Sequence, residues 1–178
     1  LFAFSSTNNK IIFFDYKAPP EFVKTIEINL KSLSRKIIHY NKFLYFVTDK
    51  GKIYQYNFYN YKKKLLYQAG KAITEFIIDG QVIYYTSIDG GIYRVNIKSK
   101  STSEIHLDKN LVSALAINEN YLVCGSWSGM VYLVDLSSFS IQKSWPIHKR
   151  AILKIKKGKN NIMYSSGLDK TIKSWQIH

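Results

Sequence analysis

Short runs of alternating apolar and polar residues, separated by turn residues, follow one another along the chain. The segment 22–30 ends in the text T-I-E-I-N-L, and such alternation is typical of a strand with one face in water. Gly80, Gly90 and Gly129 each fall between two runs, where tight hairpin turns need a flexible residue. The pattern predicts an all-β fold of short antiparallel strands.

One predicted strand has a sequence pattern that recurs about every 40 residues. Each copy begins with Ile or Val, carries an aromatic residue or Val three positions later, and has Asp, Asn or Gln at the next position. A period near 40 with several short strands in each copy predicts a β-propeller of four-stranded antiparallel blades. The copies begin at Ile11, Ile53, Ile92, Val131 and Ile172.

We expect one partial propeller over residues 1–178, with about four and a half blades and about eighteen strands. The first blade lacks its inner strand, and the last blade lacks its outer strand. Because a propeller avoids exposed edges by closing on itself, we expect the chain to be part of a larger, seven-bladed ring. A five-bladed ring with irregular closure is the alternative. The predicted blades span residues 1–30, 36–67, 72–107, 112–145 and 152–178.

The last copy carries polar residues that the other copies lack. His148 precedes it, and the segment 165–176 reads S-S-G-L-D-K-T-I-K-S-W-Q. This text resembles the closing half of a WD40 repeat, which has Gly-His near its start and Trp-Asp at its end. Here Ile147 replaces the Gly and Gln176 replaces the final Asp.

The resemblance implies a hydrogen-bonded chain inside the last blade. The carboxylate would orient the imidazole, and the indole N–H would close the chain. We expect the other blades, which lack the His, to be held by apolar packing. The residues implied are His148, Ser165 or Ser166, Asp169 and Trp175.

Length and composition narrow the class of protein. No apolar run approaches the roughly 18 residues of a membrane helix, so we expect no membrane insertion. The single cysteine, Cys124, excludes an internal disulfide and is expected to be a buried, inert thiol. Its isolation fits a reducing compartment, and we expect an intracellular location in cytoplasm or nucleus, with the periplasm left open. The chain does not begin with Met, and we expect a fragment of a longer protein.

No catalytic motif is present in the sequence. It has no nucleophile elbow, no HExxH and no paired CxxC, and its four His residues lack metal-ligand spacing. We therefore expect no catalytic residue, no metal and no cofactor. One segment, 129–145, also resembles the repeats of quinoprotein dehydrogenase-type propellers. That resemblance would imply a quinoprotein-like enzyme or accessory protein, whose metal and quinone ligands this chain does not supply.

The net charge is +14, from 26 Lys and Arg against 12 Asp and Glu. A basic face for RNA, DNA or an acidic protein is one interpretation, and an ordinary solvated Lys-rich surface is the other. Propeller topology assigns one group of basic residues to connections between third and fourth strands, and a second group to the opposite face. The first group is Lys62, Lys63, Lys64, Lys98 and Lys100, and the second includes Lys149 and Arg150.

Three aromatic residues are further candidates for partner binding. Trp127 falls in the turn between the second and third strands of the fourth blade, where it either anchors a partner or folds over its own turn. Tyr59 and Tyr61 lie beside the Lys62–Lys64 run, an arrangement that can bind single-stranded nucleic acid. The alternative is that both tyrosines are ordinary residues of an outer strand, which would produce the same sequence.

The sequence favours a non-enzymatic, WD40-like propeller that acts as a scaffold for other proteins in a multi-protein complex. Rigid blades would present short loops on two faces, and binding residues would lie on those loops. A nucleic-acid or ribonucleoprotein-binding propeller is the first alternative, and a quinoprotein-like propeller is the second. Binding to phosphate groups would weaken steeply with salt, which separates the first alternative from an apolar platform.

Overall fold

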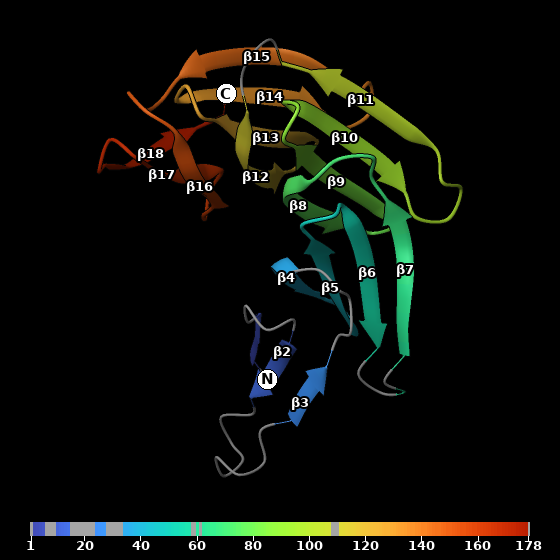
Figure 1. Cartoon of the computed structure of the whole chain (residues 1–178). Coiled ribbons are helices and arrows are strands. Elements are labelled where there is room, and N and C mark those ends of the chain that lie inside the picture. Colours follow the sequence, from blue (N-terminus) through green and yellow to red (C-terminus); the bar gives the residue numbers. More distant parts are fainter. Residues whose placement is uncertain are drawn as a thin grey trace. The chain divides into compact units, whose positions relative to one another are not determined.

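The computed structural model describes the backbone of residues 2–5, 10–14 and 24–27, and describes residues 34–57, 60, 62–107 and 111–177 fully. These residues contain eighteen strands and no helix, arranged in five antiparallel sheets of three, four, four, four and three strands (Figure 1). The succession of small antiparallel sheets is the β-propeller architecture that the repeat predicted. The chain divides into two compact units, Leu1–Ile73 and Thr74–His178.

The first unit contains two sheets. The first sheet is described by its backbone alone and consists of β1 (Phe2–Ser5), β2 (Lys10–Phe14) and β3 (Lys24–Glu27). In the second sheet, every residue of β5 after the first is buried, because both faces of this central strand are covered. The strands of the second sheet are β4 (Ser34–Tyr40), β5 (Phe43–Thr48), β6 (Lys52–Asn57) and β7 (Lys62–Gln68).

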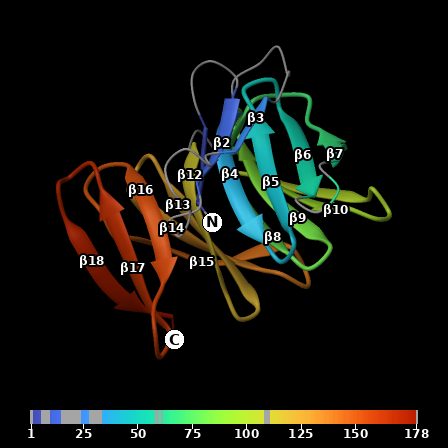
Figure 2. The same ribbon diagram turned by 90° about the horizontal axis from the view of Figure 1, so that it is seen from below.

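The second unit contains three consecutive sheets, and Figure 2 shows the last of them as three strands side by side, coloured from orange to dark red. Its first sheet is β8 (Ile73–Asp79), β9 (Val82–Ser87), β10 (Gly91–Asn96) and β11 (Thr102–His106). Its second sheet is β12 (Val112–Asn118), β13 (Tyr121–Ser126), β14 (Met130–Asp135) and β15 (Ser140–Pro146). Its third sheet is β16 (Ile152–Lys157), β17 (Ile162–Gly167) and β18 (Ile172–Gln176).

Two apolar clusters fill the space between the sheets of the second unit. One joins Tyr84 and Ile92 to Leu122, and so connects the first sheet with the second. The other joins Val123 to Met163, and so connects the second sheet with the third. Burial of these side chains stabilises the stack by about 25 cal/mol for each Å² of apolar surface removed from water.

Hydrogen bonds also join the inner strands at one end. The Thr74 hydroxyl of β8 donates to the Val112 carbonyl of β12 at 3.1 Å, and the Ser113 hydroxyl of β12 donates to the Ile152 carbonyl of β16. Each contact links the start of one inner strand to the start of the next. The inner strands therefore begin on the same side of the three sheets, and we call this side the turn face.

The turn between the second and third strands of a sheet has a recurring backbone conformation. One position in each of four turns has a positive φ, and three of the four residues are glycine, which adopts this conformation without steric cost. At Gly129 a side chain would also collide with the carbonyl oxygen of His148. The four residues are Gly51, Gly90, Gly129 and Lys170, with φ of 70°, 82°, 84° and 64°.

One predicted position is wrong. The sequence places Lys62, Lys63 and Lys64 in a connection, but β7 begins at Lys62, and the three lysines pair with Asn57, Tyr56 and Gln55. The outer strand of a sheet has an open edge and a solvated face, so a run of exposed lysines is compatible with strand pairing there. In the described part of the chain, no helix is long and apolar enough to cross a membrane.

Candidate functional site

The connection between β15 and β16 positions His148. The main-chain N–H of His148 donates to the Gly129 carbonyl at 3.1 Å, so this connection is fixed to the β13–β14 turn of the preceding sheet. The imidazole points into the last sheet, and the residue as a whole is 4% exposed. A histidine buried to this extent needs partners for both ring nitrogens.

Asp169, Ser165 and Trp175 supply a continuous hydrogen-bonded chain around the imidazole. The Nδ1 atom of His148 lies 2.9 Å and 3.0 Å from the two carboxylate oxygens of Asp169. The Nε2 atom lies 2.8 Å from the Ser165 hydroxyl, and the Trp175 indole N–H donates to the same hydroxyl at 3.2 Å. Because a carboxylate only accepts, Nδ1 carries the proton and Nε2 accepts from Ser165. Ser165 then accepts from Trp175, and every polar atom of the chain is paired.

Asp169 receives further hydrogen bonds. The Thr171 hydroxyl donates to it at 2.8 Å, and the main-chain N–H groups of Lys149 and Thr171 donate at 3.0 Å and 3.2 Å. Desolvation raises the pKa of the Asp169 carboxyl, but the hydrogen bonds from Thr171, His148 and Lys149 outweigh it. The pKa of Asp169 therefore lies well below its ordinary value, and the carboxylate stays ionised.

The order Ser165, His148, Asp169 has the residue types of a nucleophilic hydrolase site, but its placement fits a structural role. A nucleophile must reach a substrate atom. The Ser165 side chain is 2% exposed, and its hydroxyl is bonded to both His148 and Trp175. Trp175 also packs edge-to-face against Trp145 of the neighbouring sheet, with ring centroids 5.7 Å apart. The polar chain therefore holds the last sheet together and ties it to the sheet before it.

The structure distinguishes the two candidate serines and adds two residues. Ser165 enters the polar chain, while the neighbouring Ser166 is half-buried and lies on the opposite face of the strand. Thr171 contacts both Asp169 and His148, and the sequence signal for it is a hydroxyl two residues after the Asp. At Gly167 a Cβ would lie 2.6 Å from the His148 ring and 2.9 Å from Asp169, so only glycine fits there.

Exposed apolar side chains occupy equivalent positions in three turns on the turn face. Ile88 is 57% exposed, Trp127 is 60% exposed and Leu168 is 43% exposed. Each is the first residue after the second strand of its sheet and lies two positions before the residue of positive φ. The main-chain N–H of Trp127 donates to the Leu111 carbonyl at 2.9 Å, and that of Leu168 donates to the Ala151 carbonyl at 2.8 Å. These bonds fix the turns while the side chains remain in solvent.

The basic candidates lie at several places. Lys149 and Arg150 are exposed in the β15–β16 connection, on the turn face. Lys98 and Lys100 are exposed in the β10–β11 turn, at the opposite end of the first sheet of the second unit. Lys62, Lys63 and Lys64 are exposed on β7, and the Lys63 ammonium lies 5.3 Å from the centre of the Tyr54 ring. Tyr59 and Tyr61 lie outside the described residues.

Groups that bind metals or react as nucleophiles are not brought together in the described residues. No cluster of three or more His, Cys, Asp or Glu side chains that could hold a metal occurs among them. Cys124 is fully buried, and its burial raises the pKa of the thiol. A thiol of this kind is a packing residue.

The sheets and their registers define the chain as a β-propeller, and its resemblance to WD40 repeats is confirmed by a curated relative. A WD repeat-containing protein 55 homolog of Dictyostelium discoideum is 32% identical to the chain over 99 residues. The match covers 54% of this chain and 24% of the relative, so the chain spans less than two thirds of that relative's length. No family model matches the chain.

Solved structures with the same fold are diverse. A chain of the mitotic checkpoint complex superposes with a TM-score of 0.81 at 16% identity, covering 98% of this chain and 56% of that one. The computationally designed Ika4 protein superposes with a TM-score of 0.74 at 16% identity, covering 85% of this chain and 95% of that one. At this identity the likeness shows the fold alone.

Proposed function

We propose that the chain is a non-enzymatic interaction propeller, which binds other proteins through the turn face of its second unit and so serves as a scaffold in a multi-protein complex. The observation that carries the proposal is the repetition of an exposed apolar side chain at Ile88, Trp127 and Leu168. Single exposed apolar residues are common on any protein surface. Three at equivalent turns of consecutive sheets form a surface that a partner can cover.

The turn face suits a protein partner because it is rigid. The turns of Trp127 and Leu168 are fixed by main-chain hydrogen bonds to the preceding connections, so little conformational freedom is lost there on binding. Trp is also enriched among residues that dominate binding energy at interfaces. Lys149 and Arg150 lie on the same face and would form a polar rim.

The comparisons support the proposal at the level of the fold. The Dictyostelium relative is named for its WD repeats, and a chain with the same fold occurs in the mitotic checkpoint complex. A propeller can host many unrelated functions, so the proposal rests on the turn face and not on the fold.

Site-specific cross-linking in the native cells tests the proposal. A photo-cross-linking phenylalanine analogue replaces Ile88 or Leu168, one at a time, in the full-length protein. Ile141 serves as the control position, because it is an exposed apolar residue, 39% exposed, on the outer strand β15. We expect discrete protein adducts from positions 88 and 168 that are absent from position 141. No adduct from the turn positions, or adducts that disappear on nuclease treatment, would refute a protein-binding turn face.

A further inference from the structure

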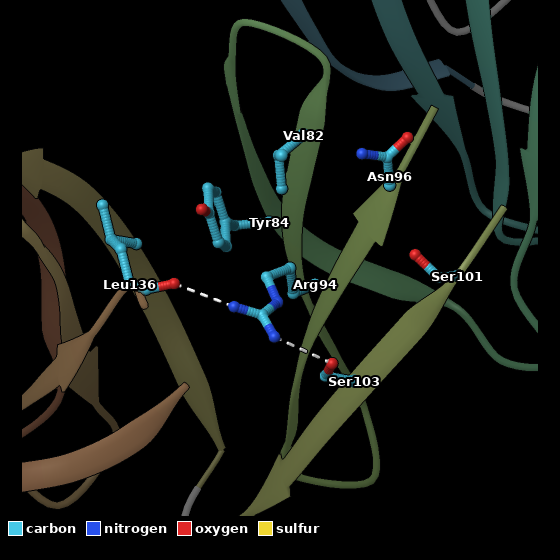
Figure 3. A pocket seen from close by; sticks show the side chains of 7 residues that line it. All are labelled: Val82, Tyr84, Arg94, Asn96, Ser101, Ser103 and Leu136. Carbon is cyan, nitrogen blue, oxygen red and sulfur yellow. Dashed lines mark hydrogen bonds between the residues drawn. The ribbon is translucent and has the colours of Figure 1, made fainter. Parts of the chain in front are cut away.

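Arg94 of β10 extends across the gap between the first and second sheets of the second unit. Its guanidinium donates to the carbonyl oxygens of Leu136 and Ser137 at 2.8 Å and 3.3 Å, and to the Ser103 hydroxyl at 3.1 Å (Figure 3). It also lies 4.7 Å from the centre of the Phe139 ring. Three oxygens do not saturate a guanidinium, which carries more N–H donors than these contacts use.

The positive charge of Arg94 has no carboxylate partner among the described residues. The side chain is half-buried, and its three hydrogen-bond acceptors are all neutral oxygens. Burial raises the pKa of the neighbouring Tyr84 hydroxyl, and the charges of Arg94 and Asp79 act on it in opposite directions. Asp79 nevertheless forms no ion pair with Arg94. A half-buried guanidinium without a counter-charge is an attractive site for an anion.

A cleft of about 280 Å³ opens beside the guanidinium. Figure 3 shows Arg94 between Tyr84 on one side and the polar side chains of Asn96, Ser101 and Ser103 on the other. Hydroxyl and amide groups can add neutral hydrogen bonds around a bound oxyanion. Lys98 and Lys100 are exposed in the adjoining turn and add positive charge at the rim.

Asn96 places a neutral side chain in the cleft beside Arg94. Its side-chain oxygen accepts the main-chain N–H groups of Lys98 and Ser99 at 2.9 Å and 3.0 Å, which fixes the β10–β11 turn. In the next sheet the equivalent residue is Asp135, whose carboxylate accepts the N–H groups of Ser137 and Ser138 in the same way. The turn therefore accepts either Asn or Asp. With Asn beside Arg94, the cleft remains open to an anion from outside.

The chemistry of the cleft favours an acidic side chain over nucleic acid. Recognition of single-stranded nucleic acid depends on exposed aromatic rings that stack on bases. The aromatic ring lining this cleft, Tyr84, is 4% exposed and belongs to the apolar core. One guanidinium surrounded by neutral donors matches a single oxyanion at the end of a side chain.

We propose that the Arg94 cleft is a second binding site, which receives a carboxylate or phosphate carried on a side chain of a partner peptide. The site lies among strands and turns at the end opposite the turn face, so it is independent of the interaction proposed for Ile88, Trp127 and Leu168. Arg94 would supply charge-assisted hydrogen bonds, and Asn96, Ser101 and Ser103 would surround the oxyanion.

Nuclear magnetic resonance of the arginine side chains tests the site directly. The chain contains three arginines, so Arg35→Lys and Arg150→Lys variants assign the Arg94 Nε–H signal. The probes are hexapeptides with a central Glu, a central phosphoserine, or a central Gln as the neutral control, and a short single-stranded RNA. We expect the Arg94 signal and the amides of residues 96–103 to shift with the Glu or phosphoserine peptide. They should not shift with the Gln peptide.

The Asn96→Asp variant is the matched control. It keeps the turn, because Asp135 fixes the equivalent turn, and it places a carboxylate beside Arg94. Hydrogen bonds from the Ser137 side chain and from Ser138 lower the pKa of Asp135 to about 2, so a carboxylate in this setting is ionised. We expect at least about tenfold weaker peptide binding, as for loss of a charge-assisted hydrogen bond, with an unchanged denaturation midpoint.

Three outcomes would overturn the site. The first is an Arg94 signal that shifts equally with the Glu, phosphoserine and Gln peptides. The second is peptide binding that the Asn96→Asp variant retains in full. The third is no shift with any peptide at millimolar concentration. A shift caused by the RNA alone would also overturn the peptide assignment. A preference between the Glu and phosphoserine peptides would support the site and identify the source of the oxyanion.

Discussion

The second and third sheets of the second unit share one backbone plan but are held together differently. In both, the second strand pairs with the third in the same register, so that Cys124 is equivalent to Ser165 and Val134 is equivalent to Trp175. Leu107, in the connection before β12, is equivalent to Ile147 before β16, and the position equivalent to His148 lies outside the described residues. Cys124 and Val134 are both buried in one apolar cluster.

This comparison shows that the polar chain is not needed to form the sheet. Apolar residues at the two positions equivalent to Ser165 and Trp175 give the same pairing and the same turn. A polar chain, however, depends on every partner being present, because a buried polar atom that loses its partner is costly. Apolar packing depends mainly on volume. The two sheets should therefore respond differently to the same kind of substitution.

The turns of the two sheets should give the largest difference. Gly129→Ala forces a side chain into a conformation that costs roughly 1–2 kcal/mol, and it also pushes against the His148 carbonyl, so we expect a loss of about 2–4 kcal/mol. Lys170 occupies the equivalent position with a φ of 64°, so Lys170→Gly should stabilise by up to about 1 kcal/mol. Urea unfolding of the two variants measures both effects. If Lys170→Gly destabilises the protein as Gly129→Ala does, the two positions do not have the same conformational requirement.

Exchanging the central residues should cost stability in both sheets. Ser165→Cys replaces a good hydrogen-bond partner of His148 and Trp175 by a weak one, and Cys124→Ser buries a hydroxyl among apolar side chains. We expect each change to lower the free energy of unfolding by about 1–3 kcal/mol. Thermal unfolding followed by circular dichroism measures it. A neutral result for either exchange would mean that the polar chain and the apolar cluster are interchangeable.

Acid should weaken the last sheet through Asp169. The pKa of Asp169 is lower in the folded protein than its ordinary value of 3.8, so its ionised form adds stability above that value. This stability is lost as the pH falls below about 4 toward the lowered pKa, because the unfolded state then binds a proton that the folded state does not yet bind. Asp169→Asn should destabilise the protein at pH 7 and reduce the loss between pH 4 and pH 2. Denaturation midpoints across this range check the sign, and a wild-type midpoint that rises with acid would contradict it.

The sequence predicted the architecture because periodicity is a local property. The 40-residue spacing of the copies and the turn residues between strands predicted the sheets. The His, Ser, Asp and Trp of the last copy predicted the polar chain. Ser165 and Ser166 could not be separated, because adjacent strand residues point to opposite faces and only the pairing with Lys173 and Ile172 decides which face is buried.

Long-range contacts account for what the sequence did not predict. The Arg94 cleft depends on carbonyl oxygens of Leu136 and Ser137, more than 40 residues away along the chain. Nothing in the sequence next to Arg94 indicates these hydrogen bonds. The lysines at 62–64 were misplaced for a different reason. A charged run is typical of a connection, but an exposed outer strand can have the same sequence.

The smallest of these effects should come from the indole N–H. Trp175→Phe keeps an aromatic ring against Trp145 but leaves the Ser165 hydroxyl without its donor. Ser165 can still donate to His148, so only the hydrogen bond from the indole is lost and no charge is left unpaired. We expect a loss of about 0.5–1.5 kcal/mol, comparable with one net hydrogen bond. Urea unfolding measures it, with Trp145→Phe as the control that keeps the hydrogen bond and alters the same ring pair. If Trp175→Phe costs no more than Trp145→Phe, the indole contributes by packing alone, as Val134 does in the neighbouring sheet.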